Sequence, residues 1–310
     1  MHQTTNQMKR REFLNSATTA AALTATAGLS FPRIHAEAAR KPERKPILKS
    51  LKFGMVREKL SIMDKFKLLK DLGYDGVELN SPGGANKKQC LEASQKTELP
   101  IHGVVDSRHW RVRATDPKPE QRKKCAADLL TAVKDSHFCG GTSVLFVPGH
   151  GKDGPEEKIV PLSMEVIREV LPTAEELKIH ILIENVWNHM FYDHEGKPEQ
   201  SADRLAAFID GFKTPLVGSY FDIGNHHKYG QPEGWVRTLG KRIVKLDVKD
   251  FSRKRNNWAK LGEGTIDYSA VRNALDEIGF SGWCTAEVGG GNRKRLALIL
   301  EKMNQLLPNA

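Results

Sequence analysis

The stretch Ile181-Leu182-Ile183-Glu184-Asn185 is a short apolar run that ends in a carboxylate. The same pattern returns at four other places, namely Gly76-Val77-Glu78-Leu79, Ser219-Tyr220-Phe221-Asp222, Val244-Lys245-Leu246-Asp247 and Cys284-Thr285-Ala286-Glu287. Such runs are typical of buried strands, and longer segments with helical periodicity separate them here. The alternation favours βα units arranged around a parallel sheet.

Eight segments of the chain read as strands: Lys52–Val56, Gly76–Asn80, Ile101–Asp106, Ser143–Val147, His180–Asn185, Val217–Phe221, Ile243–Asp247 and Trp283–Val288. Eight βα repeats at this length predict a (β/α)₈ TIM barrel, an α/β fold with one domain in residues 51–310. The alternative is an open doubly wound sheet. A dinucleotide-binding motif belongs after the first strand of such a sheet, whereas the run of three glycines, Gly289-Gly290-Gly291, follows the last one.

Local signals place several helices between these strands. Ser61 followed by Asp64 resembles a capping box, and Gly73 provides a stop after the helix. The later helices are expected at Ser201–Phe212, Tyr268–Ile278 and Arg293–Leu307.

The first 38 residues resemble a twin-arginine signal peptide. Arg10-Arg11 precedes an Ala-, Thr- and Leu-rich run from Ala17 to Leu29, and Ala36-Glu37-Ala38 fits a cleavage site. The apolar run is too short for a membrane span, so no stable span is expected after processing. We therefore expect a signal peptide at 1–38, a linker at 39–50 and a periplasmic location. An uncleaved anchor or an unstructured tail is the alternative.

The charge of the chain does not indicate a nucleic-acid partner. The formal net charge is +10, but the first 40 residues already hold five Lys or Arg against two Asp or Glu. The remaining basic residues are spread out and form no stripe interleaved with aromatic residues, so we interpret them as a solvated surface and expect no nucleic acid. The four cysteines are far apart and form no Cys-x-x-Cys pair, which argues against a zinc ribbon. A homo-oligomer is left open.

The strand-end carboxylates point to a metal. In a barrel the carboxyl ends of the strands meet at one mouth, so these side chains converge there. Converging like charges repel strongly at low dielectric unless a cation neutralises them. An ion pair with Lys or Arg would explain any one carboxylate, but a divalent cation explains the set. Oxygen ligands without sulfur favour Mn²⁺ or Mg²⁺, with Co²⁺ and Zn²⁺ as alternatives.

Four segments of the sequence resemble the xylose-isomerase-like barrels, a family with sugar-phosphate isomerases, ketose 3-epimerases, inosose dehydratases and endonuclease IV. They are Ile183–Asn188, Tyr220–Asn225, Leu239–Phe251 and Leu261–Glu287. The first two look most like the ribulose- and xylulose-phosphate 3-epimerase and hexulose-phosphate isomerase branch. By this resemblance the metal ligands are Glu184, Asp222, Asp247 and Glu287. Asp247 stands where the family usually has His in a His-x-Lys-Asp motif, and the exchange favours hard cations further.

The resemblance also implies a reaction. A metal polarises a carbonyl, and a base removes the neighbouring proton to give a metal-stabilised enediolate. Glu184 and Glu287 are the expected acid–base pair. Further residues are expected to bind substrate: Glu78, His102, Trp187, Asn188, Asn225, His226, Lys249 and Arg253. Three of these residues have alternative interpretations. His102 could be a histidine of the core, Trp187 could serve packing alone, and Arg253 could be a surface cation.

The sequence therefore predicts an exported, metal-dependent isomerase or epimerase that acts on a small sugar or keto-sugar. A lyase or dehydratase on a keto-sugar or keto-inositol uses the same proton abstraction and is the alternative enzyme. A non-catalytic sugar-binding barrel is the alternative without chemistry. Because sugar phosphates are chiefly cytoplasmic, an exported enzyme is expected to meet free sugars or oxidised glycosides.

Overall fold

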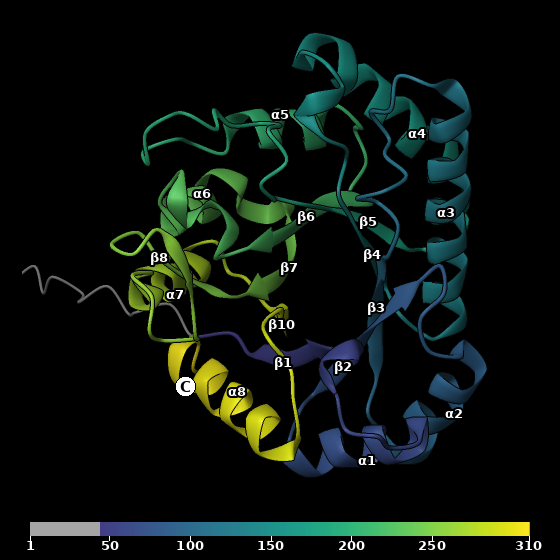
Figure 1. The fold of residues 1–310 in the computed structure, drawn as a ribbon, viewed down its shortest axis with the longest axis vertical. Helices are drawn as coiled ribbons and strands as arrows, with labels where there is room; N and C mark the ends of the chain where they lie inside the picture. The colour runs from purple at the N-terminus through teal and green to yellow at the C-terminus, as the bar shows by residue number, and fades with distance from the viewer. Residues whose placement is uncertain (1–43, 310) are drawn as a thin grey trace, which may run out of the picture. The chain divides into compact units, whose positions relative to one another are not determined.

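The computed structural model describes residues 44–309, and the expected signal peptide at 1–38 lies outside them. The described chain folds as a (β/α)₈ barrel whose eight parallel strands close in the order β1-β10-β7-β6-β5-β4-β3-β2 (Figure 1). The strands are β1 Ile47–Lys52, β2 Gly76–Ser81, β3 Ile101–Asp106, β4 Ser143–Phe146, β5 His180–Glu184, β6 Val217–Asp222, β7 Ile243–Val248 and β10 Gly282–Ala286. The predicted TIM barrel is confirmed.

Helices surround the barrel, and a small antiparallel hairpin follows β7. The helices are α1 Ile62–Leu72, α2 Lys87–Thr97, α3 Pro119–Phe138, α4 Glu156–Leu177, α5 Asp203–Asp210, α6 Pro232–Leu239, α7 Tyr268–Glu277 and α8 Arg293–Leu306. The hairpin consists of β8 Asp250–Ser252 and β9 Asn257–Ala259. No helix of residues 44–309 has the length and apolar character needed to cross a bilayer.

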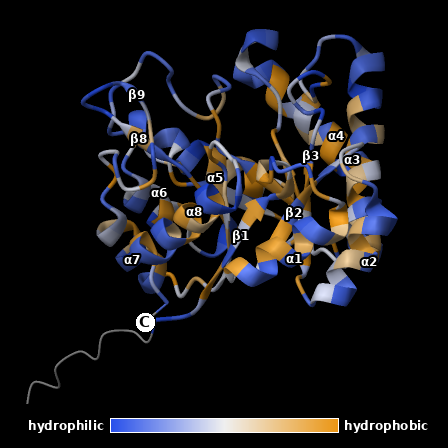
Figure 2. Ribbon diagram, turned by 60° about the horizontal axis from the view of Figure 1, so that its bottom comes forward, coloured by the Kyte–Doolittle hydropathy of each residue, from blue (hydrophilic) through white to orange (hydrophobic). Residues whose placement is uncertain are grey.

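Local chemistry sets the helix ends as predicted for α1. The Ser61 hydroxyl accepts the backbone N–H of Asp64 at 3.1 Å, which satisfies a donor that the first helical turn leaves free. Gly73 ends the helix with φ of 89°, a conformation that costs glycine little. The helices present their apolar faces to the strands (Figure 2).

The first strand differs from the sequence-based expectation. It covers Ile47–Lys52, whereas Phe53–Met55 forms a short 3₁₀ helix. The barrel thus begins inside the segment 39–50 that was expected to be a linker. Lysines and a proline surround Ile47 and hide the strand pattern, and Lys49 is buried with its ammonium bonded to the Ile47 carbonyl at 2.8 Å.

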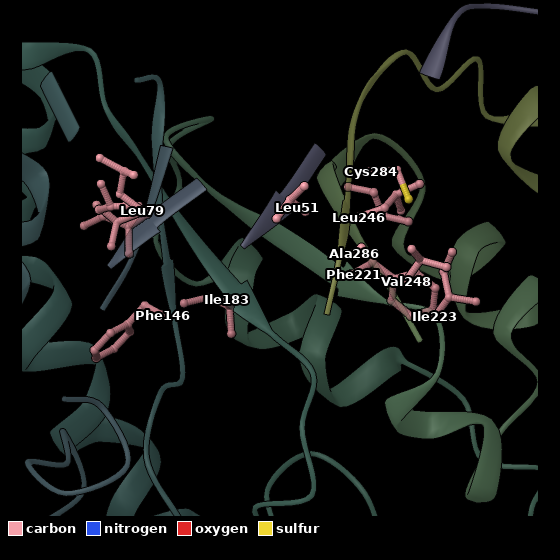
Figure 3. Packing of buried hydrophobic residues seen from close by; sticks show 14 of the residues in the cluster. Leu51, Leu79, Phe146, Ile183, Phe221, Ile223, Leu246, Val248, Cys284 and Ala286 are labelled. Carbon is pink, nitrogen blue, oxygen red and sulfur yellow. The ribbon is translucent and has the colours of Figure 1, made fainter. Parts of the chain in front are cut away.

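Apolar side chains of the barrel form two groups. The larger lies between strands and helices, with Leu79, Phe146 and Phe221 among its members (Figure 3). The smaller consists of Leu145, Leu182 and Tyr220 inside the barrel. Alternate strand residues point to opposite faces, so β4, β5 and β6 contribute to both groups.

The rest of the barrel interior is polar. The Lys245 ammonium lies 3.0 Å from Nδ1 of His102, and Nε2 of His102 lies 2.9 Å from the Ser50 hydroxyl. Tyr220 and Thr285 pair through their hydroxyls at 2.6 Å. Burial lowers the pKa of His102 well below its usual value and that of Lys245 to about 7. This network fills the barrel beneath the carboxylates.

Candidate metal centre

Four carboxylates converge at the carboxyl ends of four consecutive strands, β5, β6, β7 and β10. One oxygen from each of Glu184, Asp222, Asp247 and Glu287 lies within 4.8 Å of the others. We call these residues the carboxylate quartet. The first three are buried, whereas the Glu287 side chain is 39% exposed. The structure brings together the four residues that the sequence predicted as metal ligands.

Backbone and amide groups hold two members of the quartet in place. Oδ1 of Asp222 accepts the backbone N–H groups of Gly224 at 2.8 Å and Asn225 at 2.6 Å. The side-chain amide of Asn225 donates to Oε1 of Glu184 at 3.2 Å and to the Asn185 carbonyl at 2.8 Å. Asp222 is therefore fixed by one oxygen and presents the other to the quartet.

Two lysines neutralise part of this charge. The ammonium of Lys249 lies 3.1 Å from Oδ2 of Asp222 and 2.5 Å from Oε2 of Glu287. The ammonium of Lys52 lies 2.8 Å from both Asp247 and Glu78. Lys52 was not predicted, because the sequence placed it at the start of the first strand, whereas it ends β1 and so reaches the mouth.

Burial dominates the proton affinity of three members of the quartet, whereas for Glu287 the Lys249 and Lys52 ammonium groups outweigh burial and lower the pKa. Burial raises the pKa of Glu184 and Asp247 well above their usual values, and the neighbouring Glu287 raises both further. Burial raises the pKa of Asp222 to about 6 despite the Lys249 ammonium. Although burial opposes the charged form of Lys249, Asp222 and Glu287 raise its pKa. Lys52 and Lys249 thus do not fully compensate the negative charge of the four carboxylates.

The quartet fits a divalent cation. Oδ1 of Asp247 is buried without a hydrogen bond, and Oδ2 of Asp222 and Oε2 of Glu287 meet only the Lys249 ammonium, at ion-pair distance. Three under-satisfied carboxylate oxygens from three strands are an unusual arrangement in a protein interior. Hard divalent cations take such oxygen ligands.

A cavity of about 260 Å³ opens above the quartet. Glu184, Asn225, Lys249 and Glu287 line it on the barrel side, and His109, Trp110, Trp187 and Trp258 line it elsewhere. The aromatic residues provide apolar surface next to a charged floor, an arrangement that suits a sugar ring.

Of the residues expected to bind substrate, Trp187, Asn225 and Lys249 line this cavity. Glu78 lies in the middle of β2 and binds Lys52, which also binds Asp247 of the quartet. His102 lies near the start of β3, where the sequence placed it; it bonds to Ser50 and stacks on Trp283 with ring centroids 4.5 Å apart, contacts that fit the alternative of a core histidine.

Three other expected residues have structural contacts instead. Asn188 donates to the Gly149 carbonyl at 2.9 Å, and His226 stacks on Trp235 with centroids 4.5 Å apart. The Arg253 guanidinium donates to the carbonyls of His227 and Gly230. Their polar groups hold the loops around the mouth, and none of the three lines the cavity.

Sequence reasoning missed His109, Trp110 and Trp258. His109 is buried in the loop after β3, its Nδ1 accepts the Val147 backbone N–H at 3.3 Å, and burial lowers its pKa to about 3. These residues lie in loops or the short hairpin, where no periodic pattern marks them. For His109 and Trp110 the available signal was proximity to the predicted end of the third strand, whereas Trp258 follows no predicted strand end closely.

Known proteins resemble this chain in sequence or in structure. A relative in Methanocaldococcus jannaschii, an uncharacterised protein, is 26% identical over 219 residues, which is 69% of this chain and 72% of that protein. A D-tagatose 3-epimerase-like protein superposes with a TM-score of 0.68 at 20% identity over 84% of this chain and 98% of its own. The IolI protein, solved with a bound zinc atom, gives 0.69 at 16% identity over 84% and 98%.

The family model described as xylose isomerase-like TIM barrel matches residues 66–307. The match runs from α1 through α8 and includes all four members of the quartet. This chain belongs to the xylose isomerase-like TIM barrel family.

Proposed function

We propose that this protein is a sugar isomerase or epimerase that depends on a divalent metal held by Glu184, Asp222, Asp247 and Glu287. The observation that carries the proposal is the convergence of four carboxylates whose buried oxygens lack sufficient partners, at the floor of a cavity with aromatic walls. The family and its epimerase-like structural neighbour support the reaction class.

The ligand chemistry favours Mn²⁺ or Mg²⁺, because the quartet offers four carboxylates and no nitrogen or sulfur. When bound, the cation supplies Lewis acidity that polarises a substrate carbonyl. The chain itself limits the charge excess through Lys52 and Lys249, which offset the quartet from two sides.

Glu184 and Glu287 are the proton carriers in this proposal. They end β5 and follow β10, with β6 and β7 between them, so they face the cavity from separated positions on its floor. The Asn225 amide orients Glu184, and the Lys249 ammonium orients Glu287. One carboxylate removes the proton next to the carbonyl, and the other returns a proton to the opposite face.

In this proposal the cavity walls orient the substrate and keep water away from the reacting carbon. Trp110, Trp187 and Trp258 present apolar surface to the C–H faces of a sugar and exclude water from the reacting carbon.

The test is incubation of Mn²⁺-loaded protein with free and phosphorylated ketoses in D₂O, followed by NMR. Deuterium exchange at a carbon next to the carbonyl, with formation of an epimer or isomer, is the expected result. Exchange with loss of a leaving group would replace the proposal by the lyase. No exchange with any sugar would overturn it.

We also propose export by the twin-arginine route, on the basis of Arg10-Arg11 and Ala36-Glu37-Ala38. Such a route places the enzyme where free sugars and glycosides are the available substrates.

A further inference from the structure

A second cavity adjoins the one above the carboxylate quartet. It has a volume of about 470 Å³ and shares Lys249, Trp258 and Glu287 with the first. Its remaining lining comes from the hairpin and from the segment after β10, through Ala259, Val288 and Gly289 among others. Two cavities therefore meet at Trp258 and Glu287, one over the predicted metal ligands and one beside them.

The size of the first cavity is small for a complete ligand site. Pockets that bind drug-sized ligands usually hold about 300–1,000 Å³. The cavity over the quartet, at about 260 Å³, lies just below that range, whereas the adjoining one lies inside it. A substrate that filled only the first would leave the larger space beside the reacting carbon open to water.

Trp258 lies at the border between the two cavities, and its contacts hold it in that position. Its indole stacks on Trp187 with ring centroids 4.9 Å apart, yet 43% of its surface is exposed. The loop after the hairpin is anchored by Asp250, whose carboxylate accepts the backbone N–H groups of Gly262 and Gly264 at 2.9 and 3.0 Å. An exposed tryptophan held in a fixed position is a platform for the apolar face of a sugar ring.

The lining of the second cavity does not suit a phosphate. Lys249 is its basic side chain, and that ammonium is already paired with Asp222 and Glu287. Backbone N–H groups at the nearby start of α8 already have partners. The Asn292 side chain accepts the N–H of Arg295, and the Glu58 carboxylate accepts that of Arg293. A carboxylate at this helix start repels a second anion where the helix would otherwise attract one.

We propose that the substrate has two rings. The reacting keto-sugar unit lies over the quartet, and a second, uncharged sugar ring occupies the larger cavity against Trp258. This inference rests on the proposed function and names its substrate class as glycosides or disaccharides rather than sugar phosphates. Trp258 is then a specificity residue for the ring that does not react.

The test is calorimetric titration of the Mn²⁺-loaded full chain with pairs that share a ketose unit. D-Fructose is compared with maltulose and lactulose, which carry a second ring on the same ketose, and with fructose 6-phosphate, which carries a charge instead. We expect the disaccharides to bind at least about tenfold more tightly than fructose, a difference of ~1.4 kcal/mol.

Matched variants locate the effect. Trp258→Ala should bring the disaccharide-to-fructose ratio of affinities close to one, and Trp258→Phe should restore most of it. Trp110→Ala is the control, because Trp110 is similarly exposed but lines only the smaller cavity. It should weaken both sugars and leave their ratio unchanged.

The outcomes separate this inference from the proposed function. Equal binding of fructose and both disaccharides, or tightest binding of fructose 6-phosphate, would overturn the two-ring substrate. A ratio that survives Trp258→Ala would overturn the role of Trp258. The function itself is judged independently by proton exchange of the same sugars in D₂O, so a monosaccharide epimerase would be recognised as such.

Discussion

The ammonium of Lys52 lies 2.8 Å from Oδ2 of Asp247, although β10 separates their strands β1 and β7 in the barrel. Asp247 stands where the sequence resemblance leads one to expect a histidine, so this site has one more negative charge. Lys52, which also binds Glu78, offsets that charge inside the barrel. The two residues form a compensated pair, and their ion pair explains how a fourth carboxylate is accommodated.

Replacing Lys52 by Met should therefore destabilise the metal-free protein. Breaking a buried ion pair by removal of one partner costs about 3–5 kcal/mol, because the other charge is left uncompensated. Saturating Mn²⁺ should recover part of this loss, because a bound cation replaces the missing charge. Thermal unfolding in EDTA and in Mn²⁺ measures both. Lys65→Met is the control, since Lys65 binds the Val56 carbonyl away from the quartet. Equal losses in the two buffers would contradict the prediction.

Asp222→Asn should remove the metal without collapsing the loop. The amide oxygen of Asn can still accept the N–H groups of Gly224 and Asn225, but the charge that faces the quartet is gone. We expect about one divalent metal per wild-type chain and little in the variant, by elemental analysis after dialysis. Asp250→Asn is the matched control, because Asp250 also accepts backbone N–H groups but lies outside the quartet. Undiminished metal in Asp222→Asn would refute the ligand assignment.

The sequence predicted the barrel and five strand-end carboxylates because both depend on regular patterns, and the family resemblance selected the quartet among the five. Each carboxylate follows an apolar run, and parallel strands bring such positions to one mouth. Lys52 was misplaced for the opposite reason, since β1 is interrupted by Lys49 and follows a basic segment that resembles a linker. A shift of a few residues then moved Lys52 from the mouth to the wrong end of the strand.

The cavity walls could not be predicted in the same way. Trp258 lies in a short hairpin and His109 in a loop, and both make contacts with residues far away in the sequence, Trp187 and Val147 respectively. Conversely, His226 and Arg253 follow strand ends closely, yet their polar groups are used by Asn185 and by backbone carbonyls. Proximity to a strand end predicts a location near the mouth but not the direction of a side chain.

Stability should fall as the pH drops below about 6.5, with His226 as one cause. Burial lowers the pKa of His226 to about 3, so the folded protein keeps it neutral while the unfolded chain takes up a proton. Proton uptake by the unfolded state alone costs on the order of 2 kcal/mol of stability at pH 5. Urea unfolding at pH 7 and pH 5 should show a smaller pH effect in His226→Gln than in wild type. The exposed His137→Gln should behave like wild type, and an unchanged pH effect in His226→Gln would count against this account.

Export depends on residues outside the described structure and is tested separately. Replacing Arg10 and Arg11 by Lys should leave the precursor in the cytoplasm, because the twin-arginine motif is the expected recognition element. Fractionation with immunoblotting measures the processed form. Arg40→Lys, which changes a basic residue beyond the expected cleavage site, is the control. Normal processing of the double variant would argue for another route.

The proposed acid–base role of Glu184 and Glu287 can be separated from metal binding by Glu→Gln substitutions. Glutamine at position 184 or 287 keeps an oxygen for the metal but cannot carry a proton. Turnover should therefore fall by about 10²–10⁴-fold, the usual contribution of a general acid or base, while metal content falls much less. The exposed Glu263→Gln is the control and should retain both.

The two variants should also differ from each other. Glu184 and Glu287 reach the cavity from β5 and from the end of β10, so each is expected to serve one face of the reacting carbon. Glu184→Gln should still exchange the substrate proton with D₂O from one epimer, and Glu287→Gln from the other. NMR of each epimer in D₂O measures this directly. If both variants bind metal and turn over near-normally, these glutamates are ligands alone, and the proton must be moved by another group at the cavity, such as Lys249.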